Sequence, residues 1–330
     1  MKVLEVNHLE TSFAIKKNKF LAIRDVSLHV DEGEILGIVG ESGSGKSVTM
    51  KSVVGILPSN GQVESGEILF RGTNLLQIKP EEKRALLGND ITMIFQDPMT
   101  ALNPLKTIGY HIEEIIIRHQ KVDRVSARKQ AEAILNIVEI PDAKRRLTQY
   151  PHEFSGGMRQ RVVIGMALVN SPQLLIADEP TTALDVTIQF QILKLIKKLQ
   201  AKNKMAVVLI THDLAVVYNM CHRILVMYGG KILEEGTRTE IFDNPQHPYT
   251  LALMESIPNL ESAEKSKLEP IEGIAPTLDN MPAGCPFAPR CKHAMAICGH
   301  EMPTKHTFSK THSSYCHLNG SNPAHGGSDA

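Results

Sequence analysis

A glycine-rich loop near the N-terminus has the residue types and spacing that bind phosphate. Residues 40–47 read Gly-Glu-Ser-Gly-Ser-Gly-Lys-Ser and match G-x-x-x-x-G-K-[ST] throughout. Glycines let backbone N–H groups crowd around an anion, and a following helix turns its positive end towards it. The apolar run at 34–40 predicts a buried strand before the loop, and residues 46–57 predict a helix after it. We expect Lys46 to reach the β- and γ-phosphates of a nucleotide and the Ser47 hydroxyl to coordinate Mg²⁺. The contacts predicted in this segment are Ser42, Gly43, Ser44, Gly45, Lys46, Ser47 and Val48.

A pair of adjacent carboxylates follows a second apolar run. Residues 174–178 predict a strand that delivers Asp178 to its carboxyl end, where ligands collect in open α/β sheets. Asp178 is predicted to hold Mg²⁺, and Glu179 to act on an attacking water as general base. Because Pro180 follows directly, the alternative interpretation is an acidic pair that caps a helix.

Strands and helices alternate along most of the chain. Residues 2–34 carry short alternating runs typical of antiparallel strands. Residues 104–139 repeat apolar side chains at helical spacing, which predicts a helical insert. Together these patterns predict an α/β protein with a mostly parallel sheet. Further strands are expected at 66–70, 91–95, 206–210 and 223–228, and further helices at 155–169 and 186–200.

The composition excludes several classes of protein. The 330 residues are 42% apolar, which is enough for a substantial core. Basic and acidic side chains balance at 36 each, which argues against nucleic-acid binding through overall charge. No apolar run is long enough to span a membrane, and the first ten residues do not resemble a secretory signal. Five cysteines without such a signal favour a reduced, cytosolic chain.

A third motif gives the arrangement a family resemblance. Residues 154–160 read Phe-Ser-Gly-Gly-Met-Arg-Gln, which resembles the signature motif of ABC-type ATPases. The phosphate loop, Gln96, the segment 177–185 and the segment 210–213 are similar to that family's other motifs and follow its order. Phe154 and Met158, in place of the commoner Leu and Gln, resemble the oligopeptide/dipeptide importer branch.

The resemblance implies a fold and a domain organisation. It implies a P-loop NTPase of the ABC type, with an N-terminal antiparallel β subdomain and a helical subdomain at about 98–165. The nucleotide-binding domain would cover 1–245. A small C-terminal extension of the oligopeptide-transporter type, which carries four cysteines, would cover 246–330.

The resemblance also implies that two such domains pair head to tail around ATP. Ser155, Gly156 and Gly157 would contact the γ-phosphate of ATP bound by the partner chain. As an alternative, Ser155 is a plain helix cap, although a cap does not account for the double glycine. Asp185 would lie in the loop that couples the two sites.

Three more residues receive roles from the family. Gln96 would sense Mg²⁺ and water and pass that state to the membrane partners. His212 would contact the γ-phosphate and orient the water, although a lone histidine at a strand end is often structural. Phe13 would stack on adenine, with Phe20 as the alternative, and either ring can simply be part of the core.

The resemblance implies an ATPase that powers the import of peptides. It would work at the cytoplasmic face of the membrane as a peripheral subunit. Its partners would be a paralogous ATPase subunit, two integral membrane permeases and an extracytoplasmic peptide-binding protein, with no nucleic acid. A nickel importer and an antimicrobial-peptide resistance transporter are alternatives within the branch. A soluble ABC ATPase of DNA repair or translation is the alternative outside it, but residues 48–154 lack the sustained heptads of the repair proteins.

Four cysteines close to the C-terminus suggest a thiolate site. Cys285, Cys291, Cys298 and Cys316 are spaced C-x5-C-x6-C-x17-C, which is not a pair of CxxC zinc knuckles. The family resemblance implies a [4Fe–4S] cluster on these thiolates. Zinc is the second choice, with His293, His300 or His317 in place of one thiolate. Free thiols or disulfides are the remaining alternative. Cys221 is expected to be a small buried residue.

Overall fold

The computed structural model describes residues 1–96, 101–181, 185–256 and 271–320. The chain forms two compact units, each built from segments that are distant in sequence. Unit 1 comprises Met1–Glu5, His29–Ile35 and Ile68–Ile210, and unit 2 comprises Val6–Leu28, Leu36–Glu67 and Thr211–Ala330. The predicted start of the helical subdomain, near residue 98, and residues 182–184 of the carboxylate motif lie outside the described residues.

Three buried parallel strands form the sheet of unit 1. The strands β6 (Ile91–Ile94), β7 (Leu174–Asp178) and β8 (Ala206–Ile210) lie in the order β8-β7-β6. Leu174 pairs with Ile91 on one side and with Ala206 on the other. Every residue of β7 and β8 is buried, as expected for strands that are covered on both faces. The predicted parallel sheet is confirmed here.

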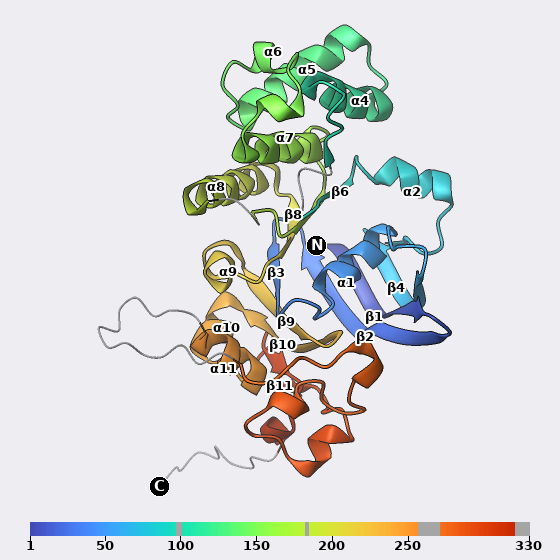
Figure 1. The fold of residues 1–330 in the computed structure, drawn as a ribbon, viewed down its shortest axis with the longest axis vertical. Helices are drawn as coiled ribbons and strands as arrows, with labels where there is room; N and C mark the ends of the chain where they lie inside the picture. The colour runs from blue at the N-terminus through green and yellow to red at the C-terminus, as the bar shows by residue number, and fades with distance from the viewer. Residues whose placement is uncertain (97–100, 182–184, 257–270, 321–330) are drawn as a thin grey trace, which may run out of the picture. The chain divides into compact units, whose positions relative to one another are not determined.

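A group of helices follows β6 in unit 1 (Figure 1). Thr107 and Asp123 cap α4 and α5, where each side chain accepts a hydrogen bond from a backbone N–H of the first turn. The apolar faces of α4, α5 and α7 pack against one another, which confirms the predicted helical insert. The group comprises α4 (Ile108–Gln120), α5 (Arg124–Ile137), α6 (Ala143–Arg146) and α7 (Gly156–Leu168), with a 3-10 turn η1 (Pro151–Glu153). Unit 1 also contains α2 (Pro80–Leu86), which precedes β6, and α8 (Val186–Asn203), which follows β7.

The N-terminal strands form an antiparallel sheet. The long strands β1 (Lys2–Ile15) and β2 (Asn18–Asp31) are followed by β4 (Gly61–Phe70) and the short β5 (Thr73–Asn74). The strand order is β2-β1-β4-β5, and Ala14 donates a backbone hydrogen bond to Asn60 just before β4. The predicted antiparallel strands are confirmed.

The sheet of unit 2 begins parallel and ends antiparallel. The strand β3 (Ile35–Val39) pairs in parallel with β9 (Arg223–Tyr228), which pairs antiparallel with β10 (Lys231–Thr237). Beyond β10 lie β12 (Ser313–Ser314) and β11 (His306–Thr307), both from the C-terminal segment. The segment predicted as an extension therefore adds strands to the edge of the unit 2 sheet. The helices of this unit are α1 (Lys46–Val54), α9 (Leu214–Met220), α10 (Arg238–Asp243) and α11 (Pro248–Glu255), with 3-10 turns η2 (Leu278–Asn280), η3 (Ala288–Arg290), η4 (Ala296–Gly299) and η5 (His317–Gly320).

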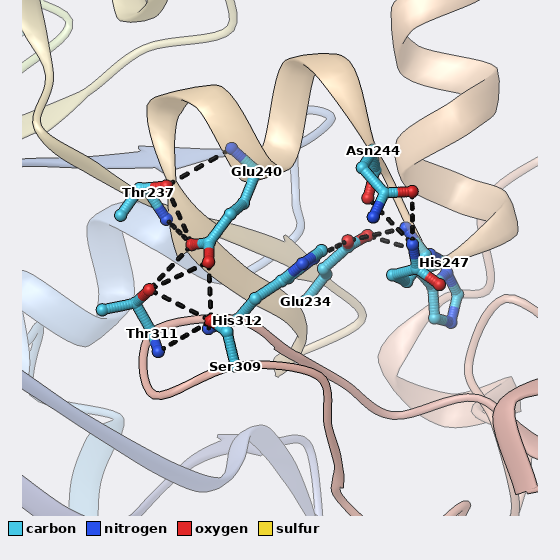
Figure 2. A network of polar contacts seen from close by, with 9 residues as sticks. Glu234, Thr237, Glu240, Asn244, His247, Ser309, Thr311 and His312 are labelled. Carbon is cyan, nitrogen blue, oxygen red and sulfur yellow. Dashed lines mark hydrogen bonds and ion pairs between the residues drawn. The ribbon is translucent and has the colours of Figure 1, made fainter. Parts of the chain in front are cut away.

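Two carboxylates, Glu234 on β10 and Glu240 on α10, hold the C-terminal segment (Figure 2). Glu234 is fully buried and accepts hydrogen bonds from the backbone N–H of His247 at 2.9 Å and from Nε2 of His312 at 2.8 Å. Glu240, at the start of α10, accepts from the hydroxyls of Ser309 and Thr311. Because a buried carboxylate is costly without partners, the contacts of Glu234 fix the segment on the sheet.

Within the described parts of the chain, no helix has both the length and the apolar character needed to cross a membrane.

Candidate nucleotide-binding site

The phosphate loop connects β3 to α1 in unit 2, and two of its glycines are required by their surroundings. Gly40 has φ +148°, and a Cβ there would lie 2.1 Å from the carbonyl oxygen of Met227. Gly45 has φ +106° and is the N-cap of α1, where a Cβ would lie 2.9 Å from the Ile23 side chain. Only glycine fits the backbone at these two positions, so the glycine spacing in the motif reflects the conformation of the loop.

Lys46 lies at the centre of the loop. Its side chain is buried, and Nζ donates to the carbonyl oxygens of Gly40 at 2.7 Å and Glu41 at 2.8 Å. The first turn of α1 carries no acidic side chain, so nothing there opposes the positive end of the helix dipole. Ser44 is buried, Ser47 and Val48 are half-buried, and Ser42 and Gly43 are exposed. The loop therefore offers backbone N–H groups and one ammonium to an anion.

The two candidate aromatic rings are both half-buried in the N-terminal strands. Phe13 lies on β1 against Gly61, where a Cβ would come within 2.7 Å of the ring carbon Cε1. Phe20 lies on β2. Neither position tests adenine stacking, which stays a prediction for Phe13.

Unit 1 holds the carboxylate pair at the end of β7. Asp178 is 3% exposed. Glu179 has a φ of +47°, which is rare for a residue with a side chain, and its N–H donates to the Ile210 carbonyl at 2.9 Å. Gln96, just after β6, donates from Nε2 to the Glu179 carboxylate at 2.9 Å. Two residues predicted to act on the same water are thus brought together, and the strained backbone of Glu179 is typical of a functional position.

The carboxylate pair does not cap a helix in the described part of unit 1. The next described helix, α8, is capped by Asp185, whose Oδ1 accepts from the Ile188 N–H at 2.9 Å. Asp185 is exposed and follows residues outside the described ranges, so its coupling role stays a prediction.

The signature segment starts helix α7. Ser155 is the N-cap, and its hydroxyl accepts from the Met158 N–H at 3.3 Å. A Cβ on Gly157 would lie 2.7 Å from the Ile188 side chain on α8, so helix packing alone requires one of the two glycines. The double glycine is therefore weaker evidence for a phosphate contact than the sequence alone suggested, because packing on Ile188 already accounts for Gly157. Ser155 is exposed, and Gly156 and Gly157 are half-buried.

Sequence reasoning missed one residue of this region. Gln160 is 1% exposed, and its Nε2 donates to the carbonyl oxygen of Pro180, directly after the carboxylate pair. It ties α7 to the end of β7. A signal was present, because Gln160 lies one helical turn beyond Gly156 on a helix that must face the core.

His212 belongs to unit 2, is exposed, and lies two residues after the last residue of β8. The next residue, Asp213, caps α9 by accepting from the N–H groups of Ala215 and Val216 at 2.9 and 3.1 Å. The cap fixes the backbone beside His212. The action of His212 on a γ-phosphate stays a prediction.

The four C-terminal cysteines gather in unit 2. They line one small cavity of about 20 Å³, together with His247, His293 and His317. Burial raises the pKa of Cys285 to about 11 and also raises the pKa of Cys291 and Cys316. All are free thiols, so the disulfide alternative is wrong. Cys221 is 4% exposed and packs on Gly37, which confirms it as a small buried residue.

The metal prediction gains no support from this geometry. Among residues 1–96, 101–181, 185–256 and 271–320, no group of three or more His, Cys, Asp or Glu side chains is arranged to hold a metal ion. A zinc ion needs its four donors within about 2.0–2.3 Å of one point. The [4Fe–4S] cluster and the zinc alternative therefore both stay predictions.

Comparison with known proteins relates these features to a family. The chain is similar to the ABC transporter family over residues 23–182 and to the oligopeptide/dipeptide transporter C-terminal region over residues 233–298. It is 50% identical to the dipeptide transport ATP-binding protein DppD of Bacillus subtilis (strain 168), over 96% of this chain and 95% of that protein. The chain belongs to the ABC transporter family.

Other relatives agree with this assignment. The oligopeptide transport ATP-binding protein OppD of the same organism is 50% identical, over 94% of this chain and 87% of that protein. The ATP-binding cassette MJ0796, solved as a dimer bound to ADP and Pi, is 28% identical with a TM-score of 0.64. That match covers 71% of this chain and 98% of the cassette. The ABC ATPase fold predicted from the motifs is confirmed.

Proposed function

We propose that this chain is the ATP-binding and ATP-hydrolysing subunit that powers peptide import across the cytoplasmic membrane. The observation that carries the proposal is the phosphate loop with its buried Lys46, in a chain half identical to dipeptide and oligopeptide transport ATP-binding proteins over nearly its whole length. The match to the oligopeptide/dipeptide C-terminal region supports peptides as cargo.

The phosphate loop binds the nucleotide in this proposal. Lys46 neutralises the β- and γ-phosphates, and the amides of residues 42–48 hold them. Ser47 and Asp178 would hold Mg²⁺, which supplies positive charge for the phosphate oxygens. Phe13 stacks on adenine.

Hydrolysis is assigned to the carboxylate pair. Glu179 accepts a proton from the attacking water, and its hydrogen bond with Gln96 orients the carboxylate. His212 contacts the γ-phosphate and aligns the water. Gln96 reports the state of the site to the membrane subunits.

Two ATPase chains form the working unit. Ser155, Gly156 and Gly157 contact the γ-phosphate held by the partner chain, and Asp185 links the two sites. The dimeric state of the cassette MJ0796 supports this arrangement. We propose that the partner is a paralogous ATPase, and that the pair works beneath two permeases and with an extracytoplasmic peptide-binding protein. The chain would then be peripheral, on the cytoplasmic face of the membrane.

The nucleotide-binding domain is proposed to span 1–245 and the C-terminal extension 246–330. Within the extension, we propose that the four thiols hold a [4Fe–4S] cluster, with zinc as the second choice. The four thiols line one cavity, and thiolates are donors to both. The cluster would stabilise the extension.

The test is ATP-driven peptide uptake. In cells that lack the native gene, the wild-type chain should restore uptake of a labelled dipeptide, and Glu179→Gln should not. The variant should keep ATP binding but lose about 10³-fold in hydrolysis, because a general base contributes about 10²–10⁴-fold. Restored nickel uptake without peptide uptake would contradict the cargo assignment. Near-normal hydrolysis by the variant would remove Glu179 from the base role.

A further inference from the structure

The acidic residue inside the phosphate loop is held by the C-terminal extension. Arg290 forms a two-pronged ion pair with Glu41, in which Nη1 donates to Oε2 at 2.6 Å and Nη2 donates to Oε1 at 3.1 Å. The other N–H groups of Arg290 donate to the Tyr228 hydroxyl and to the carbonyl oxygens of Ile271 and Glu272. All five donors of the guanidinium are therefore used.

The pair is sheltered from solvent. The Arg290 side chain is 6% exposed and that of Glu41 is 28% exposed. Burial opposes the charge of Arg290, but the hydrogen bonds with Glu41 and Tyr228 outweigh it and raise the guanidinium pKa above its usual value. The guanidinium thus stays charged in the folded chain, and bidentate pairs of this kind are strong and directional.

A second contact holds the backbone of the same loop residue. The N–H of Glu41 donates to the hydroxyl of Tyr249 at 2.8 Å. Tyr249 is the second residue of α11. Tyr249 is fully buried, and its ring packs on Tyr228 at 4.7 Å and on Phe287 at 5.1 Å between ring centroids. Phe287 lies between the first two cysteines, so the ring cluster joins the thiol segment to the loop.

The turn between β9 and β10 supplies a further link. The Gly230 N–H donates to the Ser44 carbonyl of the phosphate loop at 2.9 Å. On the other side, a Cβ on Gly229 would lie 2.7 Å from Pro286, which directly follows Cys285. The extension therefore packs on the turn that supports the loop.

The charge of Glu41 makes these contacts matter for binding. A carboxylate inside a loop that binds phosphates repels its own ligand unless a cation neutralises it. Arg290 is that cation, and it also fixes where the carboxylate points. Tyr249 fixes the backbone of the same residue.

We propose that Arg290 and Tyr249 are positioning residues for ATP, through which the C-terminal extension neutralises and holds the phosphate loop. The proposal rests on the ATP-binding role proposed above for that loop. It gives the extension a direct part in nucleotide affinity.

The test compares MgATP affinity in variants of the full-length chain by titration calorimetry at fixed ionic strength. Arg290→Gln should raise Kd about tenfold, because it leaves one uncompensated charge near the phosphates. Adding Glu41→Gln to that variant should bring Kd back to within about threefold of wild type, because the repelling charge is gone. A contact that serves only the fold would leave the Kd for MgATP unchanged in both variants.

Lys305→Gln is the matched control. Lys305 pairs with Glu235 at 3.1 Å and also joins the extension to the sheet, but the Lys305 side chain is 46% exposed and neither residue belongs to the loop. This variant should bind MgATP as wild type does. An Arg290→Gln chain with the control's Kd, or a double variant as weak as Arg290→Gln, would overturn the proposal. A wild-type chain that binds no MgATP would instead overturn the proposed function.

Two milder variants carry the test if Arg290→Gln does not fold. Arg290→Lys keeps the positive charge but loses the two parallel hydrogen bonds to the Glu41 carboxylate, and Tyr249→Phe loses only the hydroxyl. Each should raise KM for ATP about threefold, as expected for the loss of one modest hydrogen bond, with kcat at saturating ATP unchanged. Unchanged KM in both variants would refute the positioning role.

Discussion

The phosphate loop is built from the backbone of one local segment, whereas the four-cysteine pocket brings together side chains from separate turns. In the loop, Gly40 and Gly45 adopt conformations that only glycine tolerates, and Lys46 is already bound to loop carbonyls. In the pocket, the thiols share a cavity without forming a ligand set for an ion. Burial raises the pKa of Cys285 to about 11, so the pocket must lose protons before it binds any metal.

This difference decides what a sequence can reveal. The loop can be recognised from a local run of eight residues, because its glycines permit backbone conformations that other residues rarely adopt. The pocket depends on how separate turns fold towards each other. These turns carry Cys285, Cys291, Cys298 and Cys316, and 17 residues separate the last two cysteines.

Adding a methyl group to the loop tests most directly whether its backbone path requires glycine. Gly40→Ala puts a Cβ against the Met227 carbonyl, a backbone atom that cannot move aside cheaply. We expect a loss of about 3 kcal/mol in stability and no measurable MgATP binding, because strain of this kind costs about 1–3 kcal/mol for each forced conformation. Thermal unfolding with and without MgATP measures both effects.

Gly43→Ala is the matched variant. Gly43 has φ +80°, but nothing lies within 4 Å of the added Cβ. Its cost should be the left-handed conformation alone, about 1 kcal/mol. If both alanine variants unfold at the same temperature, close backbone approach is not what selects Gly40.

The sequence predicted the elements whose cause is local. Runs such as 174–178 and 206–210 are apolar throughout because both faces of a parallel strand are covered, and both form buried strands. The carboxyl end of β7 carries Asp178 as expected. The contact between Gln96 and Glu179 was implied only by the family's roles for these residues.

Features set by distant packing were not predictable in the same way. The positive φ of Glu179 and the packing of Gly157 on Ile188 depend on neighbouring elements. The ion pair between Glu41 and Arg290 joins residues 249 positions apart, and the phosphate-loop motif leaves the residue type at position 41 open. The addition of β12 to β10 is equally invisible in composition, because a strand of two residues has no periodicity.

Metal analysis tests whether the four-cysteine pocket binds a cluster. Anaerobically purified wild-type chain should contain about four irons and four acid-labile sulphides and absorb visible light, as a [4Fe–4S] cluster does. Cys298→Ser should lose this content and colour, because the pocket then lacks one thiolate. Its affinity for MgATP should fall less than that of Gly40→Ala.

Cys221→Ser is the control, since Cys221 is a buried thiol that packs on Gly37 and does not line the cavity. It should retain the metal content of wild type. About one zinc per chain without colour would replace the cluster by a zinc clamp. A chain with neither metal that still hydrolyses ATP would leave four free thiols and remove the metal prediction.

The smallest expected effect concerns the Glu240 anchor, the carboxylate on α10 that holds Ser309 and Thr311 of the thiol-bearing segment. Burial would raise the pKa of Glu240, but hydrogen bonds from Ser309, Thr237 and Thr311 outweigh it and lower the pKa from 4.5 to about 2. The folded state therefore binds this proton more weakly than the unfolded state. The anchor's stabilisation is complete above about pH 4.5 and is lost as the pH falls towards 2.

Glu240→Gln should thus cost about 1 kcal/mol at pH 7, after allowance for partial exposure of the carboxylate, and progressively less below pH 4.5. The measurement is the difference in unfolding midpoint between wild type and variant from pH 7 to pH 3. A difference that stays constant over this range would mean that the Glu240 charge does not hold the segment. Because Glu240 belongs to neither the loop nor the cavity, MgATP affinity should not change, and the anchor is then separable from both sites.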